Sequence, residues 1–421
     1  MAGPSGKRRD RRRRRRRTHL GVAPRGGSAS RVPSPQEIGT RLLHSEDPLE
    51  VELIGSMLVA GLSTTAPVDE ALIEDFVSLL SRQRSPESLA VLLAVTAVAE
   101  PPLDELARSA AADLKPGFVL PPWADILGRE EVREAWRATD AFRDQDAILL
   151  AFGYPARDPA LATVVVDRTL GRLIKDASVL PEVGPVVERW REQDDVTVES
   201  IPVGEAAGEI LRALRNTDVT VDPPITEEYA LNRAFLAALV RRVPDVEPPP
   251  EPEPPPAGVL DRLVDEFLAS DEATGLPPVA DQAVHTLITY QGEWRADDPL
   301  RWSPTVVEMC LLDWLPRSTV LEDEVLRAIP DTLRALVRFA GTRRSLPGDL
   351  VSETLDAIDR FEPEFTRALK SPSAGGPSKS LLLAMQKDGV DILDQEQVSA
   401  WIKKFNQRPL EERDRTLRGE H

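Results

Sequence analysis

The chain is poor in the two residue types that most often bind metals or form covalent cross-links. Its 421 residues include one cysteine, Cys310, and four histidines. A single cysteine excludes an internal disulfide framework and favours a reducing compartment, so we expect a cytoplasmic protein. None of the histidines lies four residues from another or near the cysteine in sequence. We therefore expect no zinc site and no other bound metal.

Common catalytic and cofactor motifs are absent as well. The sequence contains no G-x-S-x-G elbow, no G-x-x-x-x-G-K-[ST] loop and no G-x-G-x-x-G turn, which removes the usual serine nucleophile and phosphate cradles. We expect no cofactor, and an enzyme becomes the less favoured interpretation. The longest apolar run, Leu89–Ala99, is too short to span a bilayer. The arginine-rich start has no apolar core behind it, so we expect neither a membrane segment nor a secretory signal.

The chain is rich in charge, which is unevenly divided. Apolar residues make up 41% and charged residues 29% of the sequence, values typical of a globular protein, and the length predicts two or three domains. Residues 1–31 hold one Lys and eleven Arg against one Asp, a formal charge of +11. The whole chain carries −18, which leaves −29 for the remainder. A body this acidic repels nucleic acid, whereas the first residues attract it.

Residues 1–33 form a basic arm that we expect to be disordered, because nothing in it can be buried. Its ten cations between Lys7 and Arg17 are suited to neutralising a nucleic-acid backbone without reading base sequence. The candidate contacts are Arg11, Arg12, Arg13, Arg14, Arg15, Arg16 and Arg17. Two other interpretations stay open: the arm is a solvated tail, or it is an upstream extension of a chain that starts at Val32.

A proline-rich segment divides the rest of the chain. Between Val246 and Pro256 the sequence VEPPPEPEPPP holds seven prolines and three glutamates. Proline fixes φ and removes a backbone donor, so neither a helix nor a central strand is possible there. We predict a solvated polyproline II spacer. The predicted parts are 34–243, a helical and β domain; 244–257, the acidic linker; 258–370, a helical domain; 371–377, a flexible linker; and 378–421, a helical tail.

The region before the spacer is predicted to combine helices with a small antiparallel sheet. Residues 35–127 show helical periodicity, with serine–proline helix starts at Ser34 and Ser85. The pattern then becomes strand-like, and the predicted strands are Ala147–Tyr154, Ala160–Asp167, Arg172–Val179 and Val196–Ile201. A helix around residues 183–193 precedes the last of these strands, and helices over residues 204–216 and 227–242 are predicted to cover the sheet. The predicted fold class is α+β and predominantly α-helical, with an all-helical C-terminal domain.

The region after the spacer carries only helical patterns. Its clearest helix start is Trp302-Ser303-Pro304, and Pro316 is predicted to end that helix. Pro330 is predicted to divide residues 321–340 into two helices, and Pro363 to break the helix over residues 350–369. In the tail, we predict two short helices, over residues 379–387 and 395–405.

Two aspartates in the predicted sheet, Asp167 and Asp176, are the catalytic candidates. Aspartate is disfavoured in strands, which hold side chains rigidly. A tight turn between the second and third strands would place Asp167 opposite Arg172 and Asp176 opposite Thr163. If the two carboxylates converge in a partly buried pocket, they indicate an enzyme site near residues 147–201. Otherwise, Asp167 pairs with Arg172 and Asp176 faces water.

Cysteine and histidine side chains each have a structural and a functional interpretation. Cys310 lies on the apolar stripe of its helix without a nearby base, which favours an inert core thiol over a nucleophile. His285 lies in an apolar helix, which favours a hydrogen-bonded structural residue. His44, with Glu46 and Asp47, favours a surface cluster over a set of metal ligands.

Three tryptophans close in sequence, Trp294, Trp302 and Trp314, are the main aromatic feature. They are suited to a stacking or peptide-binding surface if exposed. The helix stripes and proline turns around them favour packing in the core instead.

Three passages resemble a family of actinobacterial proteins of unknown function: LLAFGYPARDPALATVVVDRTLGRLIKDA, WSPTVVEMCLLDWLPR and AWIKKFNQRP. The resemblance covers most of the chain from about Asp140 onward and leaves out the arm and the proline-rich segment. It implies no activity, cofactor or catalytic residue.

These observations favour a cytoplasmic, non-enzymatic binding or regulatory protein. It would act on a protein partner through helical surfaces, with nucleic-acid contact through the arm. The alternative hypothesis is an enzyme of undefined class with its site near residues 147–201. Carboxylates that converge in a concave pocket would support the enzyme, and scattered, outward-facing ones the binding protein.

Overall fold

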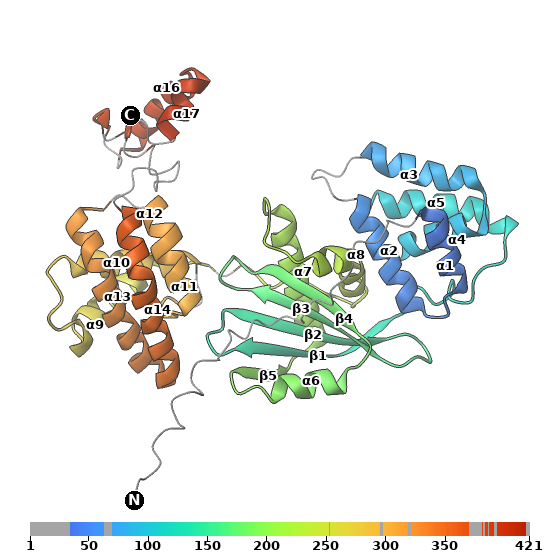
Figure 1. Ribbon diagram of the computed structural model, residues 1–421, viewed down its shortest axis with the longest axis horizontal. Helices are drawn as coiled ribbons and strands as arrows, with labels where there is room; N and C mark the ends of the chain where they lie inside the picture. Colours follow the sequence, from blue (N-terminus) through green and yellow to red (C-terminus); the bar gives the residue numbers. More distant parts are fainter. Residues whose placement is uncertain are drawn as a thin grey trace, which may run out of the picture. The chain divides into compact units, whose positions relative to one another are not determined.

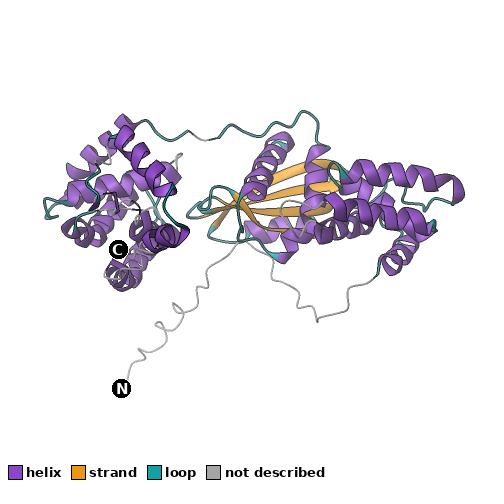
Figure 2. Cartoon of the chain, turned by 90° about the horizontal axis from the view of Figure 1, so that it is seen from above, coloured by secondary structure: helices purple, strands orange, loops and turns teal. Residues whose placement is uncertain are grey.

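The computed structural model describes residues 34–62, 70–251, 253–294, 298–318, 321–369, 381, 384–385, 387–390 and 394–417. The chain divides into two compact units, Met1–Pro250 and Glu251–His421. Figure 1 traces both units, and Figure 2 shows that the described strands all belong to the first. The fold class is α+β and mostly helical, as predicted. The arm with Arg11–Arg17 lies outside the described residues.

The first unit begins with five helices: α1 (Pro35–His44), α2 (Pro48–Leu62), α3 (Glu70–Gln83), α4 (Pro86–Val98) and α5 (Leu103–Leu114). Both predicted serine–proline starts are confirmed. The Ser34 side chain accepts from the N–H of Glu37 in a capping box, and that of Ser85 accepts from the N–H of Ser88. Each bond satisfies a helix N–H group that has no partner within the helix. The other four helices pack around α4, which is buried on most sides.

A five-stranded antiparallel sheet follows, built from β1 (Glu131–Asp140), β2 (Gln145–Gly153), β3 (Ala160–Asp167), β4 (Leu173–Leu180) and β5 (Val196–Ser200). The strand order is β4-β3-β2-β1-β5, so β1 lies between β2 and β5. The last four strands match the predicted ones, but β1 is missing from the prediction. Its sequence includes Glu131, Arg133, Glu134 and Arg137, and these charges hide the apolar alternation of a strand.

Helices cover both faces of the sheet. On one face lie α7 (Val203–Val219) and α8 (Glu227–Arg241), and on the other lies α6 (Gly184–Arg191), which packs through Val187 and Trp190. Figure 1 shows α6 beside β5 and the two longer helices beside β3 and β4. Strands β2 and β3 are buried along almost their whole length. They therefore read in the sequence as continuous apolar runs.

The register of the β3–β4 hairpin differs from the predicted one. Asp176 lies opposite Val165 rather than Thr163, and Asp167 lies opposite Leu173, one residue beyond the predicted partner. Between these two pairs, β4 contains one extra residue, which is the signature of a β-bulge. A bulge shifts the pairing of every residue beyond it, and apolar periodicity does not reveal its position.

The first part of the proline-rich segment packs on the first unit. Val246 lies half-buried against its core, and Arg212 on α7 donates to the carbonyl oxygen of Pro250 at 3.2 Å. A Cβ atom at Gly208 would overlap the carbonyl oxygen of Glu247, so this close approach requires glycine. Residues 246–250 are therefore held against α7 while Glu247 stays exposed, and the carbonyl group of Pro250 provides an acceptor for a buried arginine.

The second unit is helical throughout its described residues. Its helices are α9 (Ala257–Leu268), α10 (Ala280–Trp294), α11 (Pro304–Glu308), α12 (Leu315–Ser318), α13 (Asp323–Arg344), α14 (Gly348–Leu369), α16 (Gln395–Asn406) and α17 (Leu410–Leu417). Ser303 caps α11 as predicted, accepting from the N–H of Val306 at 3.1 Å. A π-helical stretch, Met309–Trp314, joins α11 to α12. The tail helix predicted over residues 379–387 lies largely outside the described residues.

Three prolines of this unit lie inside helices that they were predicted to end or divide. Pro316 lies in α12, Pro330 in α13 and Pro363 in α14. A proline inside a helix costs about 3 kcal/mol, and burying one large apolar side chain contributes about 1.5–3 kcal/mol. Ile329 and Leu333, on either side of Pro330, are both fully buried. Core packing on both sides of the proline thus outweighs its local cost.

Gly208→Ala should release the proline-rich segment from α7. The new Cβ overlaps a backbone atom, so the segment must shift, and we expect the free energy of unfolding to fall by about 1–3 kcal/mol. Chemical denaturation measures this loss, and faster hydrogen exchange at the amides of Val246 and Glu247 locates it. The matched control is Gly204→Ala on the same helix, where a Cβ meets nothing within 4 Å. Because alanine is the better helix former, the control should leave stability unchanged or raise it. Equal losses in both variants would contradict the contact.

Candidate functional site

The structure gives the two candidate aspartates separate partners. Asp167 is held in its own turn, where its Oδ1 accepts from the backbone N–H and the hydroxyl of Thr169 at 2.9 and 2.6 Å. Asp176 supports a helix cap: Thr226 Oγ1 donates to its Oδ1 at 2.5 Å and accepts from the N–H of Tyr229 in α8. Asp176 is buried, so the expectation that it faces water is wrong. Each carboxylate has a structural role.

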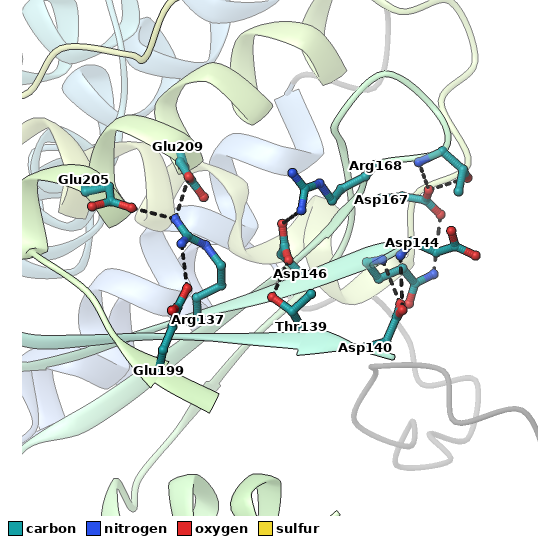
Figure 3. A network of polar contacts seen from close by, with 12 residues as sticks. Arg137, Thr139, Asp140, Asp144, Asp146, Asp167, Arg168, Glu199, Glu205 and Glu209 are labelled. Carbon is teal, nitrogen blue, oxygen red and sulfur yellow. Dashed lines mark hydrogen bonds and ion pairs between the residues drawn. The ribbon is translucent and has the colours of Figure 1, made fainter. Parts of the chain in front are cut away.

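A network of charged side chains runs along the sheet beside Asp167 (Figure 3). Arg137 on β1 contacts Glu199 on β5 at 2.9 Å, and Glu205 and Glu209 on α7 at 2.8 and 2.6 Å. The first contact joins paired residues of two strands, and the other two come from successive turns of one helix. Burial disfavours the charged form of Arg137, but the three carboxylates outweigh this effect and raise its pKa. One side chain therefore ties two strands to a helix.

Asp140, at the end of β1, has the most clearly shifted carboxyl group in this network. Its two oxygens accept from backbone N–H groups of the following turn at 3.1 and 2.8 Å. Burial, assisted by the neighbouring Asp144 carboxylate, raises its pKa to about 6. Nearby, the Thr139 hydroxyl donates to Asp146 at 2.7 Å, and Arg168 lies 3.4 Å from the other oxygen of Asp146. These contacts hold the β1–β2 and β3–β4 turns together.

A pocket of about 510 Å³ lies in the first unit, where α4, α5, the end of α8 and the turn of residues 121–128 meet. Its apolar lining consists of Leu93, Ala97, Ala99, Pro101, Ala124, Leu127 and Ala238. Its charged lining consists of Glu100, Asp104, Arg108, Arg241 and Arg242. The volume is in the range of small-molecule sites, and the lining combines apolar and charged groups in similar measure. None of these residues belongs to a recognisable motif.

Arg242 connects the pocket to a buried ionic cluster. Its guanidinium contacts Glu130, lies 3.6 Å from Glu52 and donates to the carbonyl oxygen of Ala97 in the last turn of α4. The side chains of Glu52 and Glu130 have no exposed surface. Removing ions from water costs several kcal/mol each, so two buried carboxylates need this cation.

Glu52 obtains further partners from two other segments. Its oxygens accept from the N–H of Gly128 and from the hydroxyl of Tyr154, which follows β2, both at 2.7 Å. Burial raises the pKa of its carboxyl group, and Arg242, Tyr154 and Gly128 counteract part of that effect. A glutamate inside the apolar run LEVELIGSML is a sequence signal for a buried polar group. The signal does not identify the partners, which lie far away in the chain.

The other charged side chains of the pocket form partly exposed pairs. Arg241 lies 2.5 Å from one oxygen of Glu100, whose other oxygen lies 3.0 Å from Arg233. Asp104 and Arg108, one turn apart on α5, are 2.8 Å apart. Exposed pairs of this kind contribute about 0–1 kcal/mol each. Their arginines can therefore exchange partners at little cost.

In the second unit, Cys310 and two of the three tryptophans lie in the core, as predicted. Cys310 is fully buried, and burial raises the pKa of its thiol, as expected for an inert residue. Trp302 is buried and Trp314 half-buried, and their rings lie 6.2 and 4.8 Å from the ring of Tyr290 between centroids. Both belong to the core. The side chain of Trp294 lies outside the described residues.

His44 and His285 both lie at the surface. His285 was predicted to be a hydrogen-bonded structural residue of an apolar helix, and the structure places it in an exposed position on α10. Its neighbours Val284 and Leu287 are buried, and the apolar stripe of the helix passes beside it. His44 is exposed with its Nδ1 2.7 Å from the carbonyl oxygen of Thr40. Neither histidine lines the pocket, and both lie far in sequence from the residues that do.

Similarity to known proteins does not indicate a function for this chain. Among the described residues, no group of three or more His, Cys, Asp or Glu side chains is placed to hold a metal ion, and no helix is long and apolar enough to cross a bilayer. No family model, curated protein or solved structure matches the chain. The function is therefore inferred from the geometry of the pocket and its surroundings.

Asp140→Asn should change how stability depends on pH. The folded-state pKa of about 6 lies above the ordinary value of 3.8, so the native state binds this proton more tightly than the unfolded state does. The contribution of Asp140 to stability therefore falls as pH rises through this interval and is constant above it. Asparagine does not titrate, so this dependence is lost. As the pH rises from about 4 to about 7, the free energy of unfolding of the variant should increase by about 2–3 kcal/mol relative to that of the wild type. Denaturant titrations at both pH values measure the gain. A similar gain in Asp158→Asn, which removes an exposed carboxylate, would contradict this assignment.

Arg242→Met should destabilise the first unit strongly. The substitution leaves Glu52 and Glu130 buried without their cation, and we expect a loss of about 3–5 kcal/mol in the free energy of unfolding. Chemical denaturation measures this loss, and adding Glu130→Gln should recover part of it. The control is Arg241→Met, which removes a partly exposed arginine and should cost less than about 1 kcal/mol. Similar losses in the two single variants would show that the buried cluster has no special role.

Proposed function

We propose that the protein is a cytoplasmic, non-enzymatic binding or regulatory protein that acts through helical surfaces, with the pocket of the first unit as its binding site. The composition of the pocket carries this proposal. Apolar side chains of α4, α8 and the 121–128 turn stand beside arginines and carboxylates at the ends of α4, α5 and α8. Such a lining holds a ligand by apolar contact and orients it by charge.

The pocket offers few groups for covalent or acid–base chemistry. Among the described residues that line it there is no Ser, Cys, His, Lys or Tyr, the usual nucleophiles and proton carriers. The hydroxyl group of Thr96 donates to the carbonyl oxygen of Leu92 at 2.7 Å. Glu100 and Asp104 are both paired with arginines. This chemistry favours holding a ligand over converting it.

The alternative, an enzyme with its site near residues 147–201, is supported by one observation. The pKa of Asp140, on the strand that pairs with β2, is raised to about 6, which is in the range useful for general acid–base catalysis. Asp140 does not line the pocket, and backbone N–H groups of its own turn occupy its oxygens. A structural role accounts for these contacts.

Two further parts of the chain suit macromolecular partners. On α3, Leu72 and Leu79 are 41% and 49% exposed, and Phe76 between them is half-buried. Residues spaced at i, i+4 and i+7 share one face of a helix, the pattern with which a helix enters a partner's groove. A protein partner is therefore part of the proposal, as is nucleic-acid contact through Arg11–Arg17.

Native mass spectrometry of the full-length protein, isolated from its own cells, tests the proposed binding site. We expect a non-covalent small-molecule adduct in the wild type and in Ala112→Phe, and none in Ala124→Phe. Ala124 lines the pocket, so a phenyl ring there fills part of it, whereas Ala112 is exposed on α5 outside the lining. An adduct that persists in Ala124→Phe, or no adduct in any of the three proteins, contradicts the proposal. An adduct that the purified protein converts into a product supports the enzyme.

A second experiment distinguishes partners of the arm from partners of the folded units. The isolation is repeated with nuclease, and again with a chain that begins at Val32. Nucleic acid retained by the full-length chain and lost with the arm supports contact through Arg11–Arg17. A protein that survives both nuclease and truncation supports partner binding by the folded units.

A further inference from the structure

The charged lining of the pocket consists of three arginines and two carboxylates. Arg242 faces the buried Glu52 and Glu130 behind the lining, which leaves Arg108 and Arg241 with Asp104 and Glu100. Each guanidinium has five N–H donors, so donors outnumber the carboxylate oxygens that face them. Glu100 also divides its oxygens between Arg241 and Arg233, and neither arginine has this carboxylate to itself. Arg108 and Arg241 therefore have more N–H donors than their carboxylates accept, while Asp104 Oδ1 is buried without a hydrogen-bond partner among the described residues.

Two of the three arginines are free to supply donors to a ligand. Arg242 is committed to the buried cluster and to the end of α4. Arg108 is 61% exposed and uses Nη2 for Asp104, and Arg241 is 39% exposed and uses Nη1 for Glu100. The remaining contacts of Arg241, to two carbonyl oxygens at the end of α4, are long, at 3.4 and 3.5 Å. Both arginines keep N–H groups for an anion, which guanidinium groups bind with two parallel hydrogen bonds.

The rest of the lining determines what accompanies the anionic group. Leu93, Ala97, Ala124, Leu127 and Ala238 provide an apolar surface next to the arginines. An inorganic ion would leave this surface in contact with water, whereas a ligand with an apolar body would cover it. A volume of about 510 Å³ accommodates a small organic molecule.

We propose that the pocket binds a small organic anion, with its carboxylate or phosphate group on Arg108 and Arg241 and its apolar body on Leu93 and Leu127. This assignment deepens the proposed function and rests on it. The charged group is recognised by side chains of two helices, α5 and α8. The ion pairs with Asp104 and Glu100 hold both guanidinium groups in place and are weak enough to rearrange around the ligand.

Isothermal titration of the full-length protein with benzoate and with phenyl phosphate tests this assignment. We expect both probes to bind and to raise the melting temperature, and their relative affinities identify the preferred anionic group. In the double variant Arg108→Gln/Arg241→Gln the affinity should fall on the order of 10- to 100-fold, the usual effect of losing charge-assisted hydrogen bonds. The matched control is Arg129→Gln, which removes an exposed arginine outside the lining and should leave binding unchanged.

The other outcomes overturn the assignment in distinguishable ways. Unchanged affinity in the double variant would show that the two arginines do not bind the anionic group. Inorganic phosphate that binds as tightly as phenyl phosphate would show that the apolar lining does not contribute. Binding of benzylamine that Ala124→Phe abolishes would show that the pocket takes a cation, which leaves the proposed function intact. If no probe binds but a native adduct is found in the pocket, the ligand belongs to another class. If neither is found, the inference and the proposed function fail together.

Discussion

Arg242 is the side chain on which the first unit most depends. It follows the last residue of α8, and its guanidinium lies among Glu52 of α2, Glu130 of the segment before β1 and the last turn of α4. Without this cation, two buried carboxylates would carry uncompensated charge, which is among the most unfavourable arrangements in a protein interior. Because Glu52 is also bound by the hydroxyl that follows β2, helical bundle, sheet and α8 meet at one ionic cluster.

Most elements could be predicted from the sequence because burial leaves a clear pattern. Strands β2 and β3 are apolar on both faces, and the helices that begin after Ser34, Ser85 and Ser303 carry their caps in the sequence. The errors have two physical causes. Charged residues of β1 hide its buried Ala135, Trp136 and Ala138 in the sequence, and Pro330 is tolerated in α13 because core packing outweighs a lost hydrogen bond.

The candidate site could not be predicted from the sequence, because only the fold brings its residues together. Asp167 and Asp176 are near each other in sequence, yet a bulge in β4 and two local hydrogen-bonding motifs give each a separate structural role. The pocket combines Arg108 of α5 with Arg241 and Arg242 at the end of α8. An adjacent pair of arginines at a helix end is a common favourable match to the helix dipole. Nothing in the sequence indicates that this pair also caps α4.

The position of the pocket gives a bound ligand a way to influence the rest of the unit. Its lining comes from α4 and α5 of the bundle and from α8, which packs on the sheet. A ligand that contacts all three helices stabilises the arrangement in which they meet, by an amount that grows with the ratio of its concentration to its dissociation constant. The buried cluster maintains this junction in the free protein, whereas the exposed pairs beside it are weak. Exchanging weak pairs for ligand contacts therefore tightens the junction between bundle and sheet, and this differential stabilisation is what a regulatory ligand requires.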